Sequence, residues 1–365
     1  PRVSDEVNEI KGTTENIKQV TPKEIKRQIS LLNNKKCPGI DQLDAKILKE
    51  LPRKGLIMLT YIFNGVRRLG YWPKDLKNSE VIMLQKQGKP SHMANSYRPI
   101  SLQPVISKLL EKILLVRIQE NLTAIPDHQF GFRQSHSTIQ QAHRITSIIH
   151  KAFEDSEYCS AVFIDVKQAF DRVWHDGLIA KIKKCLPNQL YKILKSFLTG
   201  RYFRTRVRDA VSDFHPIKSG VPQGSVLGPI LYTIYTHDLP THNNTITGTF
   251  ADDTMIMATH QDPVIASLNL QEHLFALEEW LKEWKISINE DKSKHITFTT
   301  RTQNCEAVFI NNIEIPPSTS INYLGLHLDR RLTWGPHIKQ KSKQTMKKFK
   351  QLYWLIGRKS KMSYA

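Results

Sequence analysis

The sequence predicts an α+β fold, a sheet with helices packed on one face, on the strength of three observations. Runs rich in β-forming residues alternate with segments of helical periodicity. These runs lie at 81–84, 161–166, 245–250, 254–258, 294–299 and 320–328. Only residues 251–253 separate two of them, which is typical of a β-hairpin. Hydrophobic residues make up 40% of the 365-residue chain, enough for a substantial core.

Helices are expected to connect these runs. The first begins at Thr21-Pro22-Lys23-Glu24, where Thr21 caps, Pro22 suits the first helical position and Glu24 can complete a capping box. Residues 1–20 are polar and irregular, and we interpret them as a linker. Apolar periodicity predicts further helices ending near 51 and covering 55–69, 104–122, 136–154, 174–184 and 270–284.

The positive charge of the chain is concentrated near its C-terminal end. The net charge is +19, and residues 330–365 hold eleven Lys or Arg and no Asp or Glu. Apolar residues such as Ile338, Met346 and Phe349 recur at helical spacing among these lysines. A basic amphipathic helix of this kind suits nucleic acid, an anionic membrane surface or a calmodulin-type partner.

Cysteine usage argues against a fold stabilised by zinc or disulfides, and hydropathy argues against a membrane-spanning protein. The four cysteines stand alone at Cys37, Cys159, Cys185 and Cys305, so the sequence predicts neither a zinc knuckle nor a disulfide framework. This usage fits a reducing, intracellular compartment. No apolar run is long enough to span a bilayer, and we expect no membrane partner. The chain begins at Pro1 rather than Met, so we expect it to be a fragment of a longer polyprotein.

Three aspartates are candidates for a metal site. Asp165 ends an apolar β-run, and Asp252 and Asp253 lie between the strands of the predicted hairpin. Phosphoryl transfer needs charge neutralisation and alignment, which two Mg²⁺ ions held by a few carboxylates can supply. Paired aspartates are also good turn formers, so Asp252-Asp253 alone would favour an ordinary turn. The presence of Asp165 at a strand end makes the metal site the stronger interpretation.

Seven blocks of sequence, in order, resemble those of reverse transcriptases. Two of them hold the candidate aspartates: Phe163-Ile-Asp165-Val-Lys-Gln-Ala-Phe170-Asp171 and Phe250-Ala-Asp252-Asp253. Between these two, Ser219-Gly-Val-Pro-Gln-Gly-Ser-Val-Leu-Gly-Pro229 is similar to the family's Gly-rich substrate-binding motif. The others are Asn95-Ser-Tyr-Arg-Pro-Ile-Ser-Leu102, Gln129-Phe-Gly-Phe-Arg133, Asn289-Glu-Asp-Lys292-Ser293 and Tyr323-Leu-Gly-Leu326. The Tyr-Arg-Pro-Ile-Ser-Leu and Gln-Phe-Gly-Phe-Arg blocks are similar to those of LINE-type (non-LTR) retrotransposons. The stretch from Leu324 to Trp334 resembles the jockey clade.

This resemblance implies a right-hand polymerase with fingers, an antiparallel palm sheet backed by helices, and the start of a thumb. It assigns residues 21–157 to the fingers with part of the palm, 158–329 to the palm and 330–365 to the start of a truncated basic thumb. The implied partners are an RNA template, a DNA primer and dNTPs. The implied cofactor is a pair of Mg²⁺ ions, for which Mn²⁺ could substitute. A polyprotein of this family would carry an endonuclease upstream and would need a nuclear stage for integration.

The resemblance also implies roles for the catalytic block. Asp171 in the same block is expected to be structural. Phe170 corresponds to a steric gate, a bulky ring that leaves no room for a ribose 2′-OH, although taken alone it would be an ordinary core Phe. The catalytic and metal-binding residues correspond to Asp165, Asp252 and Asp253, with Val166 contributing its backbone carbonyl.

Further residues are expected to contact the nucleotide. Arg98 and Lys86 resemble finger residues that bind the triphosphate, the first by bidentate contact and the second as a point charge. Either could instead belong to a solvated basic face. Gln223 and Gly224 should lie beside the nucleotide, because glycine allows close backbone approach, although an ordinary Pro-Gly turn is the simpler alternative. Lys292 occupies the position of a general acid for pyrophosphate departure.

The predicted function is therefore RNA-directed DNA polymerase, a nucleotidyltransferase that extends a DNA 3′-OH on an RNA template by two-metal chemistry. Tyr323-Leu324-Gly325 resembles the primer grip, and a buried strand turn would be compatible with that role. One alternative is an intron-encoded maturase with the same activity. Another is a catalytically silent RNA-binding remnant of a retroelement, whose expected signature is the loss of an Asp.

Overall fold

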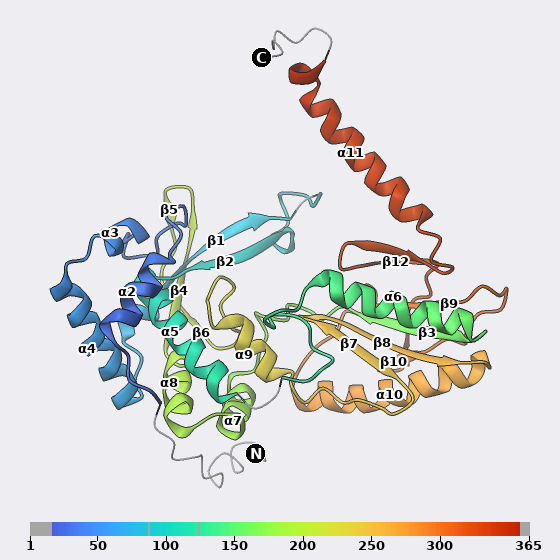
Figure 1. Ribbon diagram of the computed structural model, residues 1–365, viewed down its shortest axis with the longest axis horizontal. Helices are drawn as coiled ribbons and strands as arrows, with labels where there is room; N and C mark the ends of the chain where they lie inside the picture. The colour runs from blue at the N-terminus through green and yellow to red at the C-terminus, as the bar shows by residue number, and fades with distance from the viewer. Residues whose placement is uncertain (1–16, 87, 123–124, 358–365) are drawn as a thin grey trace. The chain divides into compact units, whose positions relative to one another are not determined.

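A four-stranded antiparallel sheet carries the three candidate aspartates at the ends of its strands. Figure 1 shows this sheet. The computed structural model describes residues 17–86, 88–122 and 125–357. The strand order is β7-β8-β3-β9, and the strands are β3 (Tyr158–Ile164), β7 (Ile246–Phe250), β8 (Asp253–His260) and β9 (Lys294–Phe298). Every residue of the central strand β3 is buried, as its apolar, β-branched and aromatic content favours. The predicted β-runs at 161–166, 245–250, 254–258 and 294–299 and the hairpin between two of them are confirmed.

Helices cover both faces of this sheet, so the prediction of helices on one face was wrong. Ile145 and Ile149 of α6 (Thr138–Glu154) pack with Phe163 of β3 in one apolar cluster. Tyr158 of β3 packs with Ala266 of α10 (Pro263–Glu283) in another. Because side chains alternate across a strand, odd and even positions of β3 meet different helices. The mainly apolar β3 leaves neither face suited to solvent, which explains the second helix.

The chain divides into two compact units that are discontinuous in sequence. One unit comprises residues 1–127, 167–239 and 281–287, and the other comprises 128–166, 240–280 and 288–365. We call them the N-terminal unit and the sheet unit. The functional boundaries of fingers, palm and thumb stay predictions, because compactness in space does not define them. Residues 1–16 of the expected linker and 358–365 of the expected thumb lie outside the described residues.

The N-terminal unit combines a mixed sheet with helices. Its strand order is β2-β1-β4-β5, with β6 also paired to β4, and the β1–β4 pair is parallel. The strands are β1 (Ser79–Gln85), β2 (Tyr97–Leu102), β4 (Arg201–Val207), β5 (Ala210–Val211) and β6 (His215–Ile217). The helices are α2 (Pro22–Ser30), α3 (Ala45–Lys49), α4 (Arg53–Leu69), α5 (Val105–Asn121), α7 (His175–Cys185), α8 (Asn188–Leu198) and α9 (Gly228–Tyr235).

Helix starts follow the predicted capping chemistry with one difference. The Thr21 side chain accepts a hydrogen bond from the Glu24 backbone N–H at 3.2 Å, which confirms the start of α2. The Glu24 carboxylate does not complete the capping box there, because it pairs with Arg117 of α5 at 2.7 Å. A reciprocal capping box is present at α6, between Ser137 and Gln140.

The C-terminal part of the sheet unit departs from the predicted single strand at 320–328. This segment is a hairpin of β12 (Ser320–Tyr323) and β13 (Leu326–Asp329), preceded by a smaller hairpin of β10 (Phe309–Ile310) and β11 (Ile313–Glu314). The turn is possible because Gly325 adopts a positive φ of 83° and Leu324 one of 48°. The basic helix α11 (Gly335–Ile356) follows as predicted. Among the described helices, none combines the length and apolar character needed to cross a membrane.

Candidate active site

The three predicted aspartates gather at one end of the sheet unit. Asp165 follows the last residue of β3, and Asp252 and Asp253 lie at the tight turn between β7 and β8. Ile164 pairs with Thr254, so the register continued by one residue places Asp165 opposite Asp253. We call these three residues the acidic edge. Strand pairing alone thus brings carboxylates that are about ninety positions apart in the chain to one place.

Backbone contacts fix Asp165 and Val166. The Asp165 N–H donates to the buried Ser293 hydroxyl at 3.1 Å, and the Asn289 N–H donates to the Asp165 carbonyl at 2.7 Å. Val166 forms an antiparallel bridge with Ile288 whose hydrogen bonds involve the residues on either side of Val166. The Val166 carbonyl takes no part in that bridge, which is consistent with its predicted role as a ligand.

The electrostatics of the acidic edge are those of a site for cations. Burial raises the pKa of the Asp253 carboxyl to about 6, and the negative charges of Asp252 and Asp165 raise it as well. Asp253 is nevertheless open to solvent, so the two like charges are the contribution that a bound cation would change. The Lys292 ammonium lies 3.6 Å from the Asp165 carboxylate, with both side chains well exposed.

Oxygen donors of this kind are the ligands that Mg²⁺ prefers. Across residues 17–86, 88–122 and 125–357, no three Asp, Glu, His or Cys side chains stand close enough together to form a preassembled metal cage. The oxygen donors of Asp165, Asp252, Asp253 and Val166 are nevertheless of the kind that fits divalent cations.

A segment that the sequence analysis left without a role supports the Asp252-Asp253 turn. Residues 128–130 run beside β7, and the Phe130 N–H donates to the Thr249 carbonyl at 2.9 Å. The buried Gln129 side chain accepts from the Gly131 N–H at 2.7 Å and from the Ala251 N–H at 3.1 Å. Ala251 itself has a positive φ of 58°, which is unfavourable for a residue other than glycine.

Gly131 is required at this turn for space. A Cβ added there would lie 2.1 Å from the Ala251 nitrogen, closer than any real contact. The Gln129-Phe-Gly-Phe-Arg133 block thus holds the backbone directly before Asp252. The signal available in the sequence was the glycine between two phenylalanines, which marks a close backbone approach inside an extended segment.

The predicted primer-grip residues form the turn of the β12–β13 hairpin. The Tyr323 side chain is buried in the core, where its hydroxyl accepts from the Gln141 amide at 3.3 Å and its ring meets Phe163 edge-on at 5.1 Å. Burial raises the pKa of Tyr323 to about 12. Any contact with a primer would therefore come from the backbone of Leu324 and Gly325 rather than from the tyrosine ring.

The predicted nucleotide-binding residues, apart from Lys292, belong to the N-terminal unit. Lys86 follows β1 and is half-buried, and Arg98 is exposed on β2, where it pairs with Leu84. The Phe170 ring stacks on Tyr232 of α9, with centroids 4.8 Å apart. The Phe170 side chain is partly buried, and its role as a gate stays a prediction.

The loop formed by residues 219–229, which we call the Gly-rich loop, is anchored to β2. The Ser101 N–H donates to the Gln223 carbonyl at 2.8 Å. Gly224 adopts a positive φ of 109°, and a Cβ there would lie 2.8 Å from the Ser101 carbonyl oxygen. Glycine is therefore required at 224 by both backbone angle and space.

A fully buried carboxylate supports the other end of the Gly-rich loop. The Glu111 Oε2 of α5 accepts from the Ser225 hydroxyl at 2.5 Å and from the Val226 and Leu227 N–H groups at 2.7 and 3.0 Å. These N–H groups precede α9, where the helix dipole favours a negative charge. Burial raises the pKa of Glu111, and these hydrogen bonds lower it.

The second oxygen of Glu111 belongs to a buried network. With the Gln103 amide oriented to satisfy both neighbours, it donates to Glu111 Oε1 at 2.8 Å and accepts from Arg201 at 2.9 Å. Gly39 packs against the same place, since a Cβ there would lie 2.4 Å from the Gln103 carbonyl carbon. Gly39 belongs to the segment Lys35-Lys-Cys-Pro-Gly-Ile-Asp41, which we call the block around Gly39. The sequence analysis missed Glu111 and Gln103, although a glutamate within the apolar run of α5 was a signal of a buried partner.

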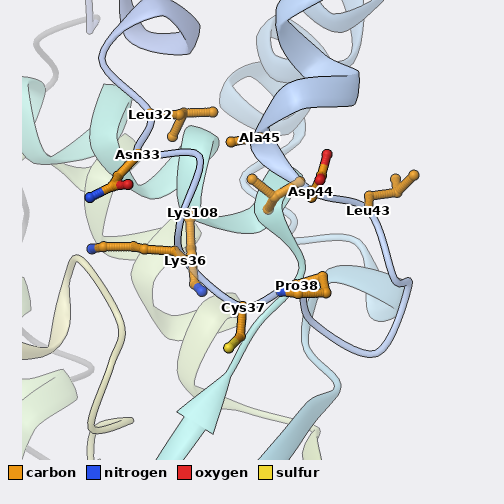
Figure 2. A pocket seen from close by; sticks show the side chains of 10 residues that line it. Leu32, Asn33, Lys36, Cys37, Pro38, Leu43, Asp44, Ala45 and Lys108 are labelled. Carbon is orange, nitrogen blue, oxygen red and sulfur yellow. The ribbon is translucent and has the colours of Figure 1, made fainter.

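The block around Gly39 also lines a small pocket against α5 (Figure 2). Lys36, Cys37 and Lys108 are among its lining residues. Burial lowers the pKa of the Lys108 ammonium. The cavity volume is about 30 Å³, room for about one water molecule, which excludes a nucleotide from this place.

The basic helix α11 presents both its lysines and its apolar side chains to solvent. None of its described residues is buried, and Met346, Phe349 and Tyr353 are each about half exposed. Its contacts within the sheet unit are to the β12–β13 hairpin, where the His327 N–H donates to the His337 ring at 3.2 Å. The predicted helix is confirmed, and its partner remains a prediction.

Comparisons with known proteins agree with these features. Residues 84–328 match the family described as "Reverse transcriptase (RNA-dependent DNA polymerase)". The chain is 42% identical over 360 residues to the probable RNA-directed DNA polymerase from transposon BS of Drosophila melanogaster, covering 95% of this chain and 40% of that protein. Two further Drosophila melanogaster polymerases are similar. The probable RNA-directed DNA polymerase from transposon X-element is 39% identical, and the match covers 98% of this chain and 40% of that protein. The RNA-directed DNA polymerase from mobile element jockey is 40% identical, and the match covers 94% of this chain and 39% of that protein.

The chain therefore spans about 40% of the length of these curated relatives. The family match includes the acidic edge, the Gly-rich loop and the predicted triphosphate-binding residues, and it ends in β13. The chain belongs to the reverse transcriptase (RNA-dependent DNA polymerase) family and is related to the jockey, X-element and BS polymerases of non-LTR retrotransposons.

Proposed function

We propose that this chain is the polymerase region of a non-LTR retrotransposon protein and extends a DNA 3′-OH primer on an RNA template. The observation that carries the proposal is the acidic edge, where strand register places Asp165 opposite Asp253 and the hairpin turn adds Asp252. In this proposal residues 21–157 provide the fingers, 158–329 the palm and 330–365 the start of the thumb, and the protein acts at a nuclear stage.

The residues that would hold two Mg²⁺ or Mn²⁺ ions are Asp165, Asp252 and Asp253, with the Val166 carbonyl. Divalent cations bound there would supply the charge neutralisation that phosphoryl transfer requires. The chain's own contribution is to hold these oxygens through the β3–β8 register and the Gln129 support of the turn. Lys292, 3.6 Å from Asp165, is placed to exchange its carboxylate partner for a departing pyrophosphate and to donate a proton to it.

The N-terminal unit would bind the incoming nucleotide. Lys86 and Arg98 supply positive charge for the triphosphate, and Gly224 allows the backbone to approach the base pair. Phe170, stacked on Tyr232, would exclude a 2′-OH from the sugar site. The turn at Leu324-Gly325 would contact the primer, and the lysines of α11 would follow the phosphate backbone without sequence preference.

Primer extension tests this proposal. The chain is incubated with poly(rA)/oligo(dT), dTTP and Mg²⁺ or Mn²⁺, beside an Asp252→Ala, Asp253→Ala double variant. An Asp155→Ala variant, changed at an exposed residue just after α6, is the matched control. We expect metal-dependent extension by the wild type and the control, reduced at least a thousandfold in the double variant.

Extension that survives loss of both aspartates would contradict the assignment of the acidic edge. Absence of extension by the wild type, together with salt-sensitive binding of the primer–template, would favour a catalytically silent RNA-binding protein. A longer protein that spans more of the length of the curated relatives would then separate that outcome from a polymerase that needs further residues.

A further inference from the structure

Asp171, expected from its sequence to be merely structural, makes a two-point contact with a predicted nucleotide-binding residue. The Gln223 side-chain amide donates to both Asp171 carboxylate oxygens, each at 3.0 Å. Both side chains are partly buried and belong to the N-terminal unit. Hydrogen bonds to a carboxylate are about twice as strong as neutral ones, so this contact restricts the Gln223 side chain.

The backbone around Asp171 is joined to the Gly-rich loop at several points. The Val221 N–H donates to the Phe170 carbonyl at 2.7 Å, and the Gly220 N–H donates to the Val173 carbonyl at 2.8 Å. A Cβ at Gly220 would lie 2.6 Å from the Asp171 carbonyl oxygen. Backbone hydrogen bonds and close packing therefore join the segment that carries the predicted gate Phe170 to the loop that carries Gln223.

The chemistry of the pair determines which way the Gln223 amide faces. An ionised carboxylate only accepts hydrogen bonds, so the amide NH₂ group must face Asp171. The side-chain amide oxygen of Gln223 is then the atom turned away from Asp171. A free glutamine would sample both amide orientations, whereas this one presents an acceptor.

Asp171 also interacts with Lys86, a predicted triphosphate-binding residue. Burial raises the pKa of its carboxyl, whereas the Gln223 hydrogen bonds and the positive charge of Lys86 lower it. Lys86 therefore lies close enough to be influenced by the Asp171 charge. The Asp171 carboxylate thus interacts with both Gln223 and Lys86, and Asp171 directly follows Phe170 in the chain.

We infer that Asp171 is a positioning residue for the incoming nucleotide, which it serves by holding the Gln223 amide in one orientation. This inference rests on the proposed polymerase function. Asp171 itself need not touch the nucleotide. If it acts through Gln223, its removal should weaken nucleotide binding and leave both the chemical step and primer–template binding unchanged.

A double-mutant cycle tests this inference. The variants are Asp171→Ala, Gln223→Ala and the combination, with Asp171→Asn as a milder change that keeps one acceptor oxygen. The exposed Asp176→Asn, five residues along the chain, is the matched control. Measurements are kcat and the dTTP KM in primer extension on poly(rA)/oligo(dT), and the dissociation constant of that primer–template. The dissociation constant of fluorescent mant-dATP is measured with Mg²⁺ and a poly(rU)/oligo(dA) primer–template whose primer ends in a dideoxynucleotide.

We expect Asp171→Ala and Gln223→Ala each to raise the dTTP KM and the mant-dATP dissociation constant about tenfold, with kcat within about twofold. The combined variant should be no worse than Gln223→Ala alone, because the two residues act as one unit. Asp171→Asn should give an intermediate increase, and Asp176→Asn should match the wild type.

Three results would overturn the inference: multiplied effects of about a hundredfold in the combined variant, unchanged nucleotide binding in Asp171→Ala, or an equal loss of kcat and primer–template affinity, which would indicate general unfolding. Lack of extension by the wild type would count against the proposed function instead. In that case the mant-dATP measurements still decide, since nucleotide binding that is absent or indifferent to Asp171 contradicts the inference.

Discussion

The acidic edge of the sheet unit and the Gly-rich loop of the N-terminal unit both depend on carboxylates, but they use them in opposite ways. At the acidic edge, three like charges gather at solvent-accessible strand ends, and the pKa of Asp253 is raised to about 6. Under the Gly-rich loop, Glu111 is fully buried and accepts three hydrogen bonds, while its other oxygen faces Gln103.

This difference distinguishes carboxylates that are suited to binding a cation from a carboxylate that stabilises the fold. The charge of Glu111 is already matched by donors within the protein, so its removal should cost stability. The repulsion at the acidic edge is relieved only by added positive charge, so the loss of one of these aspartates should cost function and little stability. The contrast predicts the size and kind of effect at each position.

The largest stability effect is expected at Glu111. Glu111→Ala removes the acceptor of the Ser225 hydroxyl, of the Val226 N–H and of the Gln103 amide, and one of the two acceptors of the Leu227 N–H. We expect the free energy of unfolding to fall by about 3–5 kcal/mol. Urea denaturation checks this against Glu120→Ala, an exposed glutamate on the same helix that should change stability by less than about 0.5 kcal/mol. A loss below about 1 kcal/mol in Glu111→Ala would remove the contrast.

The next effect concerns acid stability of the sheet that carries the acidic edge. Burial lowers the pKa of His295 on β9 to about 4, and its ring contacts the Ser160 hydroxyl at 2.8 Å. Because the folded state binds fewer protons, stability is complete above pH 6.5 and is lost as the pH falls towards 4. We expect this group to account for about 3 kcal/mol.

Urea denaturation between pH 7 and 4 measures this loss of stability. In His295→Gln the decline over this range should be smaller than in the wild type by that amount. The exposed His92→Gln is the control and should follow the wild type. Equal slopes for wild type and His295→Gln would show that acid acts elsewhere.

A smaller effect is expected where the acidic edge relies on a neutral side chain. Gln129→Met keeps the size of the residue but removes the acceptor for the Gly131 and Ala251 N–H groups. We expect a loss of about 2 kcal/mol in stability and about tenfold in extension rate, because Asp252 is no longer held firmly. The exposed Gln134→Met is the control. An unchanged extension rate would mean that the turn holds itself.

The smallest stability effect is expected at the exposed Lys292–Asp165 pair. Its side chains are 67% and 47% exposed at a separation of 3.6 Å, so Lys292→Gln should change stability by less than about 0.5 kcal/mol. If Lys292 protonates the leaving group, the extension rate should nevertheless fall while the dTTP KM stays constant. A large stability loss would instead assign Lys292 a structural role.

The sequence could predict the acidic edge because its signals are local. The β-runs, the short gap at 251–253 and the strand-terminal position of Asp165 each involve only a few neighbouring residues. Antiparallel pairing then determines which residues meet. The helices α5, α6 and α7 were predicted to within a few residues for the same reason.

The supporting residues could not be predicted because their partners are distant in sequence. Gln129 and Ala251 are separated by 122 positions, and Glu111 and Leu227 by 116. The strand β4 was missed because Arg204 and Arg206 resemble a solvated basic stretch, whereas both pair with Glu80 on β1. No periodicity within β4 reveals a carboxylate that lies more than 120 positions away.

Equilibrium binding of Mn²⁺, followed by the electron paramagnetic resonance signal of the free ion, tests the central claim most directly. Three proteins are compared: the wild type, the Asp252→Ala, Asp253→Ala variant and Asp171→Ala. All are measured in the absence of primer–template and of nucleotide. We predict Mn²⁺ binding by the wild type and by Asp171→Ala, and its loss in the double variant, because a bound cation relieves the mutual repulsion of the carboxylates at the acidic edge. Equal Mn²⁺ binding by the double variant and the wild type would contradict the account.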